Sequence, residues 1–281
     1  MPSTAHPTTG TLAVAGAVLH YRVDGSGPVL LVSQSGEGDA DRSVDLVAGL
    51  TDAFTVVTYD RRGLSRSRLA EPGRGASLVE HADDVHHLLA ALTDEPALML
   101  GCSLGAVIGL HAAQRHPGQI GTLIAHEPVA PRLLPADRRA RHEQELAHLQ
   151  DLYRREGLRA TFPEIARVLG IDPAGPDREA DLTPQPLDEQ RLANFDHFIR
   201  HDFSAVIHDT LDPAALRGTG TRILPAVGLT TPREVFDVQC ALALADLLGT
   251  EVLELPGGHN GNTSHPRAYA ARIREILGAA A

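Results

Sequence analysis

The sequence has no tryptophan, only two cysteines and just 4% aromatic residues. Two cysteines cannot build the disulfide framework of a small secreted domain, so we expect Cys102 and Cys240 to be free thiols in a reducing cytoplasm. Because aromatic side chains are scarce, leucine, alanine and valine must fill the core. Hydrophobic residues make up 43% of the 281 positions, which is enough for a substantial core.

Positive charge is also in short supply, since 25 Lys and Arg stand against 36 Asp and Glu, a formal net charge of −11. With no basic cluster, the chain is a poor candidate for binding nucleic acid or an anionic membrane surface. It has no apolar run near the roughly 18 residues that span a bilayer. Its N-terminus lacks the charge and apolar stretch of a signal peptide. We therefore expect a cytoplasmic protein with a small-molecule partner, and leave open whether it forms a homodimer.

Short apolar strands alternate with amphipathic helices along most of the chain. This alternation is typical of an α/β fold with a mostly parallel sheet and helices on both faces. The predicted strands are Leu12–Val18, Leu19–Asp24, Val29–Ser33, Thr55–Tyr59, Ala97–Gly101, Thr122–Ala125, Arg222–Val227 and Glu251–Leu255. The predicted helices between them are Asp41–Asp52, Ser77–Thr93, Leu104–His116, Pro232–Leu248 and Pro266–Leu277.

The alternation stops between residues 129 and 217, where we find no convincing strand. We interpret 129–217 as a helical cap inserted into an α/β core made of 1–128 and 218–281. Within the cap we expect the helices Ala136–Glu156, Gln190–His201 and Ser204–Leu211, and a loop rich in proline and acidic residues at Asp172–Pro186.

One pentapeptide, Gly101-Cys102-Ser103-Leu104-Gly105, fits the pattern Gly-x-Ser-x-Gly. An apolar strand runs into it and an apolar helix leaves it, which is the context of a nucleophile elbow. In such an elbow the serine backbone is strained, and only glycine fits on either side. The alternative is an ordinary turn that caps a helix. The flanking elements favour Ser103 as a nucleophile.

A serine hydroxyl needs a general base to attack near neutral pH. The chain has 15 histidines, so position must decide among them. His259 follows the last apolar strand in Leu255-Pro256-Gly257-Gly258-His259, which is where a base belongs in the chain order serine, acid, histidine. We therefore predict His259 as the base, against the alternative of a surface loop histidine.

The acid that orients the base is less obvious. The loop after the penultimate strand has Thr231 where an aspartate would be expected. Glu127 stands at the end of the strand that follows the nucleophile helix, on the same edge of the sheet as Ser103 and His259. We favour Glu127 as the acid, with Glu234 or the absence of an acid as alternatives. A carboxylate there would fix the histidine tautomer and stabilise the imidazolium.

Hydrolysis through a tetrahedral intermediate also needs two backbone N–H donors. One should be Leu104, directly after the nucleophile. The other should come from the loop after Val29–Ser33, where we choose Ser35, with Gly36 next to it.

With these residues in place, the whole chain resembles the α/β-hydrolase superfamily and, within it, the zearalenone lactonases. The resemblance implies a triad of Ser103, Glu127 and His259, and an oxyanion hole made by the amides of Ser35 and Leu104. Two features differ, because those lactonases place a cap tryptophan against the substrate and more usually carry glycine at the Ser35 position. The similar segments are Gly101-Cys102-Ser103, His126-Glu127, Val227-Gly228 with Thr231-Pro232, Leu255-Pro256-Gly257 with His259, Ser264-His265-Pro266 and Ser65-Arg66-Ser67.

These observations together predict a serine hydrolase that cleaves an ester, with the lactone of an apolar or aromatic macrolide such as zearalenone as the favoured substrate. They imply no cofactor and no metal. The alternatives are a general carboxylesterase, a C–C bond hydrolase of the same fold, and a binding protein without catalysis. Four rings of the cap are expected either to line the substrate pocket beside Gly36 or to pack the cap itself: Tyr153, Phe162, Phe195 and Phe198.

Overall fold

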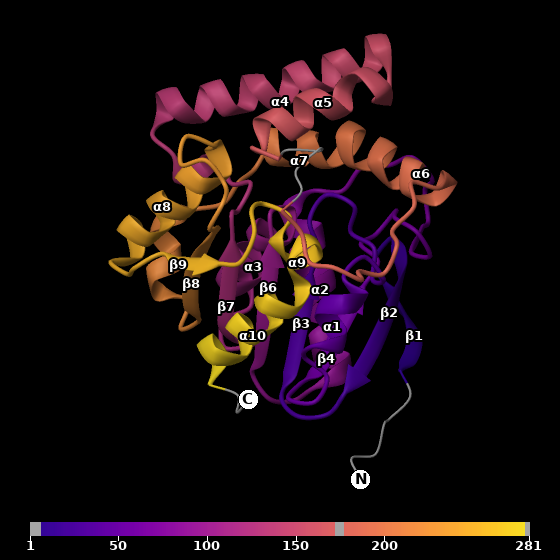
Figure 1. The fold of residues 1–281 in the computed structure, drawn as a ribbon, viewed down its shortest axis with the longest axis vertical. Coiled ribbons are helices and arrows are strands. Elements are labelled where there is room, and N and C mark those ends of the chain that lie inside the picture. Colours follow the sequence, from indigo (N-terminus) through magenta and orange to yellow (C-terminus); the bar gives the residue numbers. More distant parts are fainter. Residues whose placement is uncertain (1–6, 172–176, 279–281) are drawn as a thin grey trace.

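The computed structural model describes residues 7–171 and 177–278, in which a nine-stranded sheet forms the centre (Figure 1). Its order is β1-β2-β4-β3-β6-β7-β8-β9, with β5 paired to β2. All pairs from β4 to β9 are parallel, whereas β2 pairs antiparallel with β1, β4 and β5. The strands are β1 (Thr8–Val14), β2 (Ala17–Gly25), β3 (Val29–Ser33), β4 (Thr55–Tyr59), β5 (Arg68–Leu69), β6 (Ala97–Cys102), β7 (Ile120–His126), β8 (Arg222–Gly228) and β9 (Leu253–Leu255).

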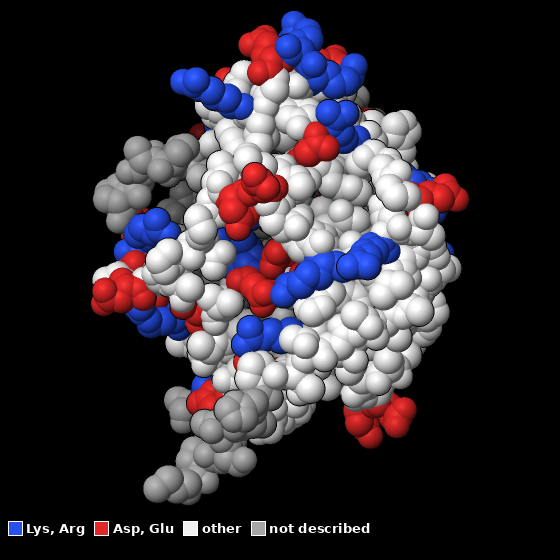
Figure 2. All heavy atoms as spheres, turned by 90° about the vertical axis from the view of Figure 1, so that its right-hand side faces the viewer, with Lys and Arg blue, Asp and Glu red and all other residues white. Residues whose placement is uncertain are grey.

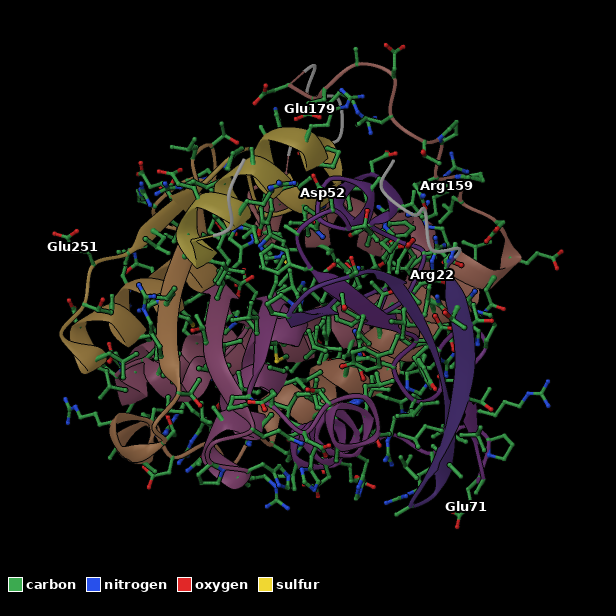
Figure 3. All side chains as sticks on the ribbon, turned by 90° about the horizontal axis from the view of Figure 1, so that it is seen from below. Arg22, Asp52, Glu71, Arg159, Glu179 and Glu251 are labelled. Carbon is green, nitrogen blue, oxygen red and sulfur yellow. The ribbon has the colours of Figure 1, made fainter. Side chains whose placement is uncertain are left out.

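Helices cover both faces of this sheet, as the sequence predicted. Successive strand residues point to opposite faces, so Leu30 and Leu31 of β3 belong to different apolar clusters. The cluster of Leu31 includes α2 (Leu78–Leu92) and α3 (Leu104–Arg115), and that of Leu30 includes α1 (Val44–Ala48) and α10 (Pro266–Leu277). By contrast with these apolar residues, charged side chains such as Glu71, Arg159 and Glu251 lie at the periphery of the molecule and point outward (Figure 3).

The helices between residues 129 and 217 lie together beyond the end of β7, above the sheet in Figure 1. The last of them is joined to its predecessor by a π-helix, Phe198–Asp202, so the chain passes from α6 to α7 with one wide turn. The division into a core and an inserted cap stays a prediction, and we use "cap" for these helices. They are α4 (Ala136–Glu156), α5 (Leu158–Val168), α6 (Glu189–His197) and α7 (Phe203–Ile207).

Several predicted boundaries were wrong. The first hairpin turns at Ala15-Gly16 rather than between Val18 and Leu19, because Gly16 adopts φ +75° without a steric penalty. The helices α5 and α9 (Gly261–Ser264) and strand β5 were not foreseen. The helices predicted at Asp41–Asp52, Pro232–Leu248 and Ser204–Leu211 are shorter or shifted, as α1, α8 (Phe236–Leu248) and α7.

Part of the sequence prediction lies outside the described residues, namely 172–176 of the predicted loop and the ends of the core segments at 1–6 and 279–281. Among the described helices, none combines the length and apolar character needed to cross a bilayer. The face shown in Figure 2 carries acidic and basic side chains interspersed over wide uncharged areas.

Candidate active site

Ser103 lies in a sharp turn between β6 and α3, with φ +54° and ψ −113°. Few residues other than glycine adopt a positive φ, so the turn is strained in the way an elbow requires. The glycines on either side are sterically required. A Cβ on Gly101 would lie 2.6 Å from the Ala106 Cα, and one on Gly105 would lie 2.1 Å from the carbonyl oxygen of Ser33.

Glu127 and His259 are brought together as predicted. The Nδ1 of His259 donates to Glu127 Oε2 at 2.6 Å, and the backbone N–H of Gly228 donates to Glu127 Oε1 at 2.7 Å. Both carboxyl oxygens therefore have partners, although the side chain is fully buried. Glu127 itself has φ +44°, a second strained residue at this edge of the sheet.

The charges of this pair reinforce each other. Burial opposes ionisation of Glu127, but the hydrogen bond from His259 and the nearby histidines lower the pKa of the carboxyl to about 2. Burial also opposes protonation of His259, yet its hydrogen bond to Glu127 and the charges of Glu127 and Asp237 raise the pKa of the ring. The carboxylate is thus held ionised beside a ring that readily accepts a proton.

Strand order places the nucleophile next to this pair. The parallel strands β6, β7, β8 and β9 are neighbours, and Ser103, Glu127 and His259 follow β6, β7 and β9. The backbone N–H of Ser103 donates to the His126 carbonyl at 2.8 Å. No hydrogen bond joins the Ser103 hydroxyl to His259 in the described chain. Such bonds are often long before substrate binds.

The alternative acid, Glu234, is exposed and makes no contact with His259 in the described residues. Thr231 is buried, and its hydroxyl has no hydrogen-bond partner among the described groups. Sequence reasoning missed Asp237, whose Oδ2 lies 3.9 Å from the Nδ1 of His259. Asp237 lies on the first turn of α8, beyond the loop after the penultimate strand where an acid was expected. It belongs to no motif that could have identified it.

The two predicted oxyanion donors are available. Leu104 is the first residue of α3, and Ser35 follows the end of β3. Neither backbone N–H donates to an acceptor within the described ranges 7–171 and 177–278. Both N–H groups therefore remain available to an oxyanion, and their role as oxyanion donors stays a prediction.

A buried arginine holds the loop that carries Ser35. The Arg61 guanidinium donates to the carbonyls of Ser35 (2.6 Å) and Gly36 (2.9 Å), and to the cap residue Asp202 (2.6 Å). Arg61 and Asp202 are each about 1% exposed as side chains. The cap thereby fixes the position of the Ser35 amide through one buried ion pair.

The four predicted rings differ in their positions. Phe198 is buried against Gly36, since a Cβ there would lie 2.5 Å from its ring. Phe162 and Phe195 pack edge to face at 4.5 Å and so join α5 to α6. Tyr153 donates to Asp196 and lines a separate hollow with residues of α4 and the π-helix, which none of Ser103, Glu127 and His259 lines. The prediction that Tyr153 lines the catalytic pocket therefore finds no support.

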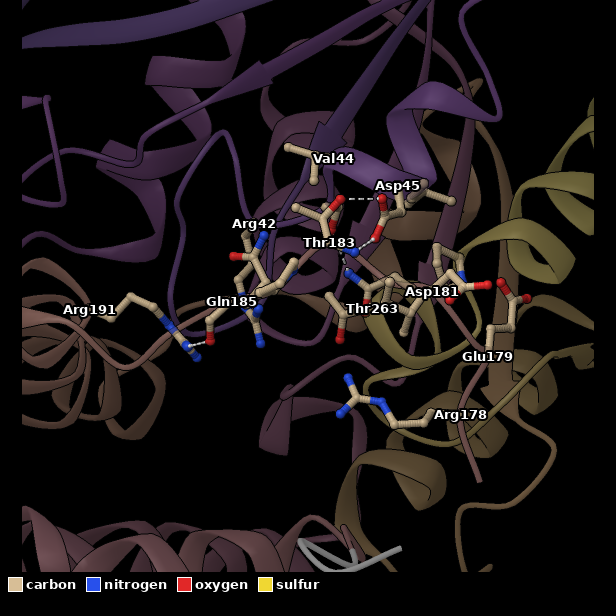
Figure 4. Close-up of a pocket in the computed structure, with 16 residues that line it drawn as sticks. Arg42, Val44, Asp45, Arg178, Glu179, Asp181, Thr183, Gln185, Arg191 and Thr263 are labelled. Atoms are coloured by element: carbon tan, nitrogen blue, oxygen red, sulfur yellow. Dashed lines mark hydrogen bonds between the residues drawn. The ribbon is translucent and has the colours of Figure 1, made fainter. Parts of the chain in front are cut away.

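A polar hollow of about 510 Å³ lies beside the site (Figure 4). None of Ser103, Glu127 and His259 lines it, but it borders the loop after β3. There Asn262 donates to the Ser43 hydroxyl at 3.1 Å, and Ser43 donates to Gln34 at 3.0 Å. Its charged lining residues are Arg42, Asp45, Arg178, Glu179, Asp181 and Arg191.

Comparison with known proteins agrees with this fold. A family model described as "alpha/beta hydrolase fold" matches residues 28–150. A hydrolase of Bacillus subtilis named YraK, described as uncharacterized, is 38% identical over 272 residues, covering 95% of each chain. The chain therefore belongs to the α/β-hydrolase family.

Two solved structures share the fold. A hydrolase from Pseudomonas aeruginosa is 25% identical with a TM-score of 0.68, over 96% of this chain and 98% of that one. An enol-lactonase from Burkholderia xenovorans is 22% identical with a TM-score of 0.66, over 96% of this chain and all of the other. At this level of identity the second likeness shows the fold alone. The finer resemblance to zearalenone lactonases stays a prediction.

Proposed function

We propose that the protein is a serine hydrolase of carboxylic esters, with lactones of apolar or aromatic compounds, zearalenone among them, as the favoured substrates. The observation that carries the proposal is the 2.6 Å hydrogen bond between His259 and Glu127 at the sheet edge where the strained Ser103 elbow lies. A carboxylate after β7, a histidine after β9 and a serine after β6 at one edge of the sheet are the parts that acyl transfer needs.

In this mechanism Ser103 Oγ attacks the ester carbonyl carbon while His259 Nε2 takes the hydroxyl proton. The oxyanion accepts hydrogen bonds from the Ser35 and Leu104 amides. His259 then gives the proton to the leaving alcohol oxygen, which remains tethered when the substrate is a lactone. Water, activated by the same ring, cleaves the acyl-enzyme. Glu127 keeps the ring oriented and stabilises the imidazolium throughout.

The test is incubation with zearalenone and with p-nitrophenyl esters, followed by product mass. A gain of one water on zearalenone, lost in Ser103→Ala, supports the lactonase. We expect Ser103→Ala to lower kcat by about 10⁴-fold or more. The exposed Ser26→Ala is the matched control and should keep full activity.

Other outcomes separate the rival functions. Turnover of aryl esters alone would indicate a general carboxylesterase, and cleavage of a diketone alone would indicate a C–C bond hydrolase. A protein that turns over none of these and resists a fluorophosphonate probe at Ser103 would be a binding protein, and the proposal would be lost.

A further inference from the structure

A second carboxyl group lies behind His259. Asp237, on the first turn of α8, is 1% exposed. Its Oδ2 is 3.9 Å from His259 Nδ1, the nitrogen that donates to Glu127. Neither oxygen of Asp237 has a hydrogen-bond partner among the described residues. The base is thus faced on one side by a fully bonded carboxylate and on another by an unbonded carboxyl.

Asp237 also faces the cap. Its Oδ1 lies 3.7 Å from Nε2 of His142 on α4, and Nδ1 of that ring lies 4.0 Å from Glu145. The His142 side chain is 1% exposed, and neither ring nitrogen is hydrogen-bonded within the described chain. Its ring packs against Phe236 with centroids 4.4 Å apart. A buried polar contact therefore runs from the catalytic histidine through Asp237 into the cap.

The groups around Asp237 determine its charge. Burial raises the pKa of its carboxyl most strongly, and the charges of Glu127 and Glu145 act in the same direction. His259 and His142 oppose them. The α8 helix itself contributes the thiol of Cys240, whose pKa is raised by burial. The pKa of Asp237 is therefore raised, whereas that of Glu127 beside His259 is lowered.

A buried polar group without a partner destabilises a fold, and such groups recur where a site uses them. We propose that Asp237 is a positioning residue for His259 and a reserve acid for Glu127, held behind the ring by His142. This rests on the proposed function. When Glu127 cannot accept the hydrogen bond from His259 Nδ1, Asp237 accepts it. A shift of the His259 ring by about 1 Å brings the two atoms to hydrogen-bond distance.

The first test is a double-mutant cycle in the full-length enzyme with the isosteric changes Glu127→Gln and Asp237→Asn, measured by kcat on an aryl ester. Asp237→Asn alone should lower kcat by less than about fivefold, but by about tenfold or more when Glu127→Gln is already present. A purely structural Asp237 would lower kcat by the same factor in both backgrounds, and that result would overturn the proposal. His142→Gln should behave as Asp237→Asn does, with a larger effect in the Glu127→Gln background.

A second test needs no turnover, so it separates failure of this inference from failure of the proposed function. The hydrogen-bonded Nδ1 proton of His259 should give a downfield proton NMR signal in the wild type, identified by its loss in His259→Gln. The signal should persist, shifted, in Glu127→Gln and vanish in the double variant. If Glu127→Gln alone abolishes it while the thermal melt shows a folded protein, Asp237 does not replace Glu127.

Discussion

The cap meets the core on two sides of the catalytic edge, and the two contacts differ in kind. On the oxyanion side buried charges form ion pairs: Arg61 with Asp202, and Arg191 with Glu37 through two hydrogen bonds of 2.7 and 2.8 Å. On the base side, Asp237 and His142 are as deeply buried, yet their side-chain N and O atoms have no hydrogen-bond partner among the described residues. Paired charges fix geometry, which an oxyanion hole needs. Unpaired buried groups carry charge only at a cost, so their protonation responds to neighbouring charges, which suits the neighbourhood of a base.

The largest expected effect is that of Arg61→Met, which removes the ion pair between Arg61 and Asp202 on the oxyanion side. This change leaves Asp202 buried and unpaired and removes two donors from the Ser35 loop, so we expect a loss of about 3–5 kcal/mol in unfolding free energy. Urea denaturation measures it. The double variant Arg61→Met with Asp202→Leu should recover most of the loss, since no charge is then stranded. A loss below about 1 kcal/mol in the single variant would contradict the role of this pair.

The two buried aspartates should respond oppositely to pH. The charges of Arg61, His81 and His197 outweigh burial and lower the pKa of Asp202, so its stabilising effect is present above the unfolded pKa and is lost as pH falls. Burial raises the pKa of Asp237, so the wild type is penalised increasingly as pH rises above the unfolded value.

Asp202→Asn should therefore cost about 2 kcal/mol or more near pH 8 and less near pH 4. Asp237→Asn should gain stability relative to wild type near pH 8, by about 1 kcal/mol, and gain nothing near pH 4. Denaturation at both pH values measures the difference. If Asp202→Asn and Asp237→Asn changed the unfolding free energy in the same direction near pH 8, the distinction between the two sides of the cap would be contradicted.

Gly36→Ala tests how tightly the cap presses on the oxyanion loop. The added methyl would lie 2.5 Å from the Phe198 ring, and we expect overpacking to cost about 1–3 kcal/mol and to lower kcat by displacing the Ser35 amide. Gly36→Ala combined with Phe198→Ala should recover much of the kcat, because the ring that the methyl meets is gone. Unchanged kcat in Gly36→Ala would mean that the loop tolerates the displacement.

The smallest effect concerns the base itself. Burial lowers the pKa of His259, but Glu127 and Asp237 more than offset it, so kcat/KM should fall as pH drops through a midpoint above about 6.5. Protonated His259 cannot accept the Ser103 proton. Glu127→Gln removes the strongest of the raising influences and should move the midpoint to lower pH. A midpoint that does not move even when Asp237→Asn is also present would exclude Glu127 as the partner of the base.

The candidate site residues could be predicted from the sequence because each follows a strand and carries a local signal. Ser103 has glycines on both sides, His259 follows the last strand, and Glu127 ends the strand after the nucleophile helix. The residues that serve them could not be found in this way. Arg61 and Asp202 are separated by 141 positions, and their pairing depends on how the cap docks. The local sequence pattern also failed to place the turn of the first hairpin, because turn geometry decides where that turn lies.

The π-helix at Phe198–Asp202 has a consequence for how such a cap can evolve or be engineered. A wide turn of this kind differs from regular α-helix by about one added residue per turn. Because the wide turn absorbs the added residue, removing one residue would restore ordinary winding while later side chains kept nearly the same direction about the helix axis. Phe198 on Gly36 and Asp202 on Arg61 would then be one residue closer along the chain. Libraries that vary this segment can therefore test a shortened segment as well as a changed composition.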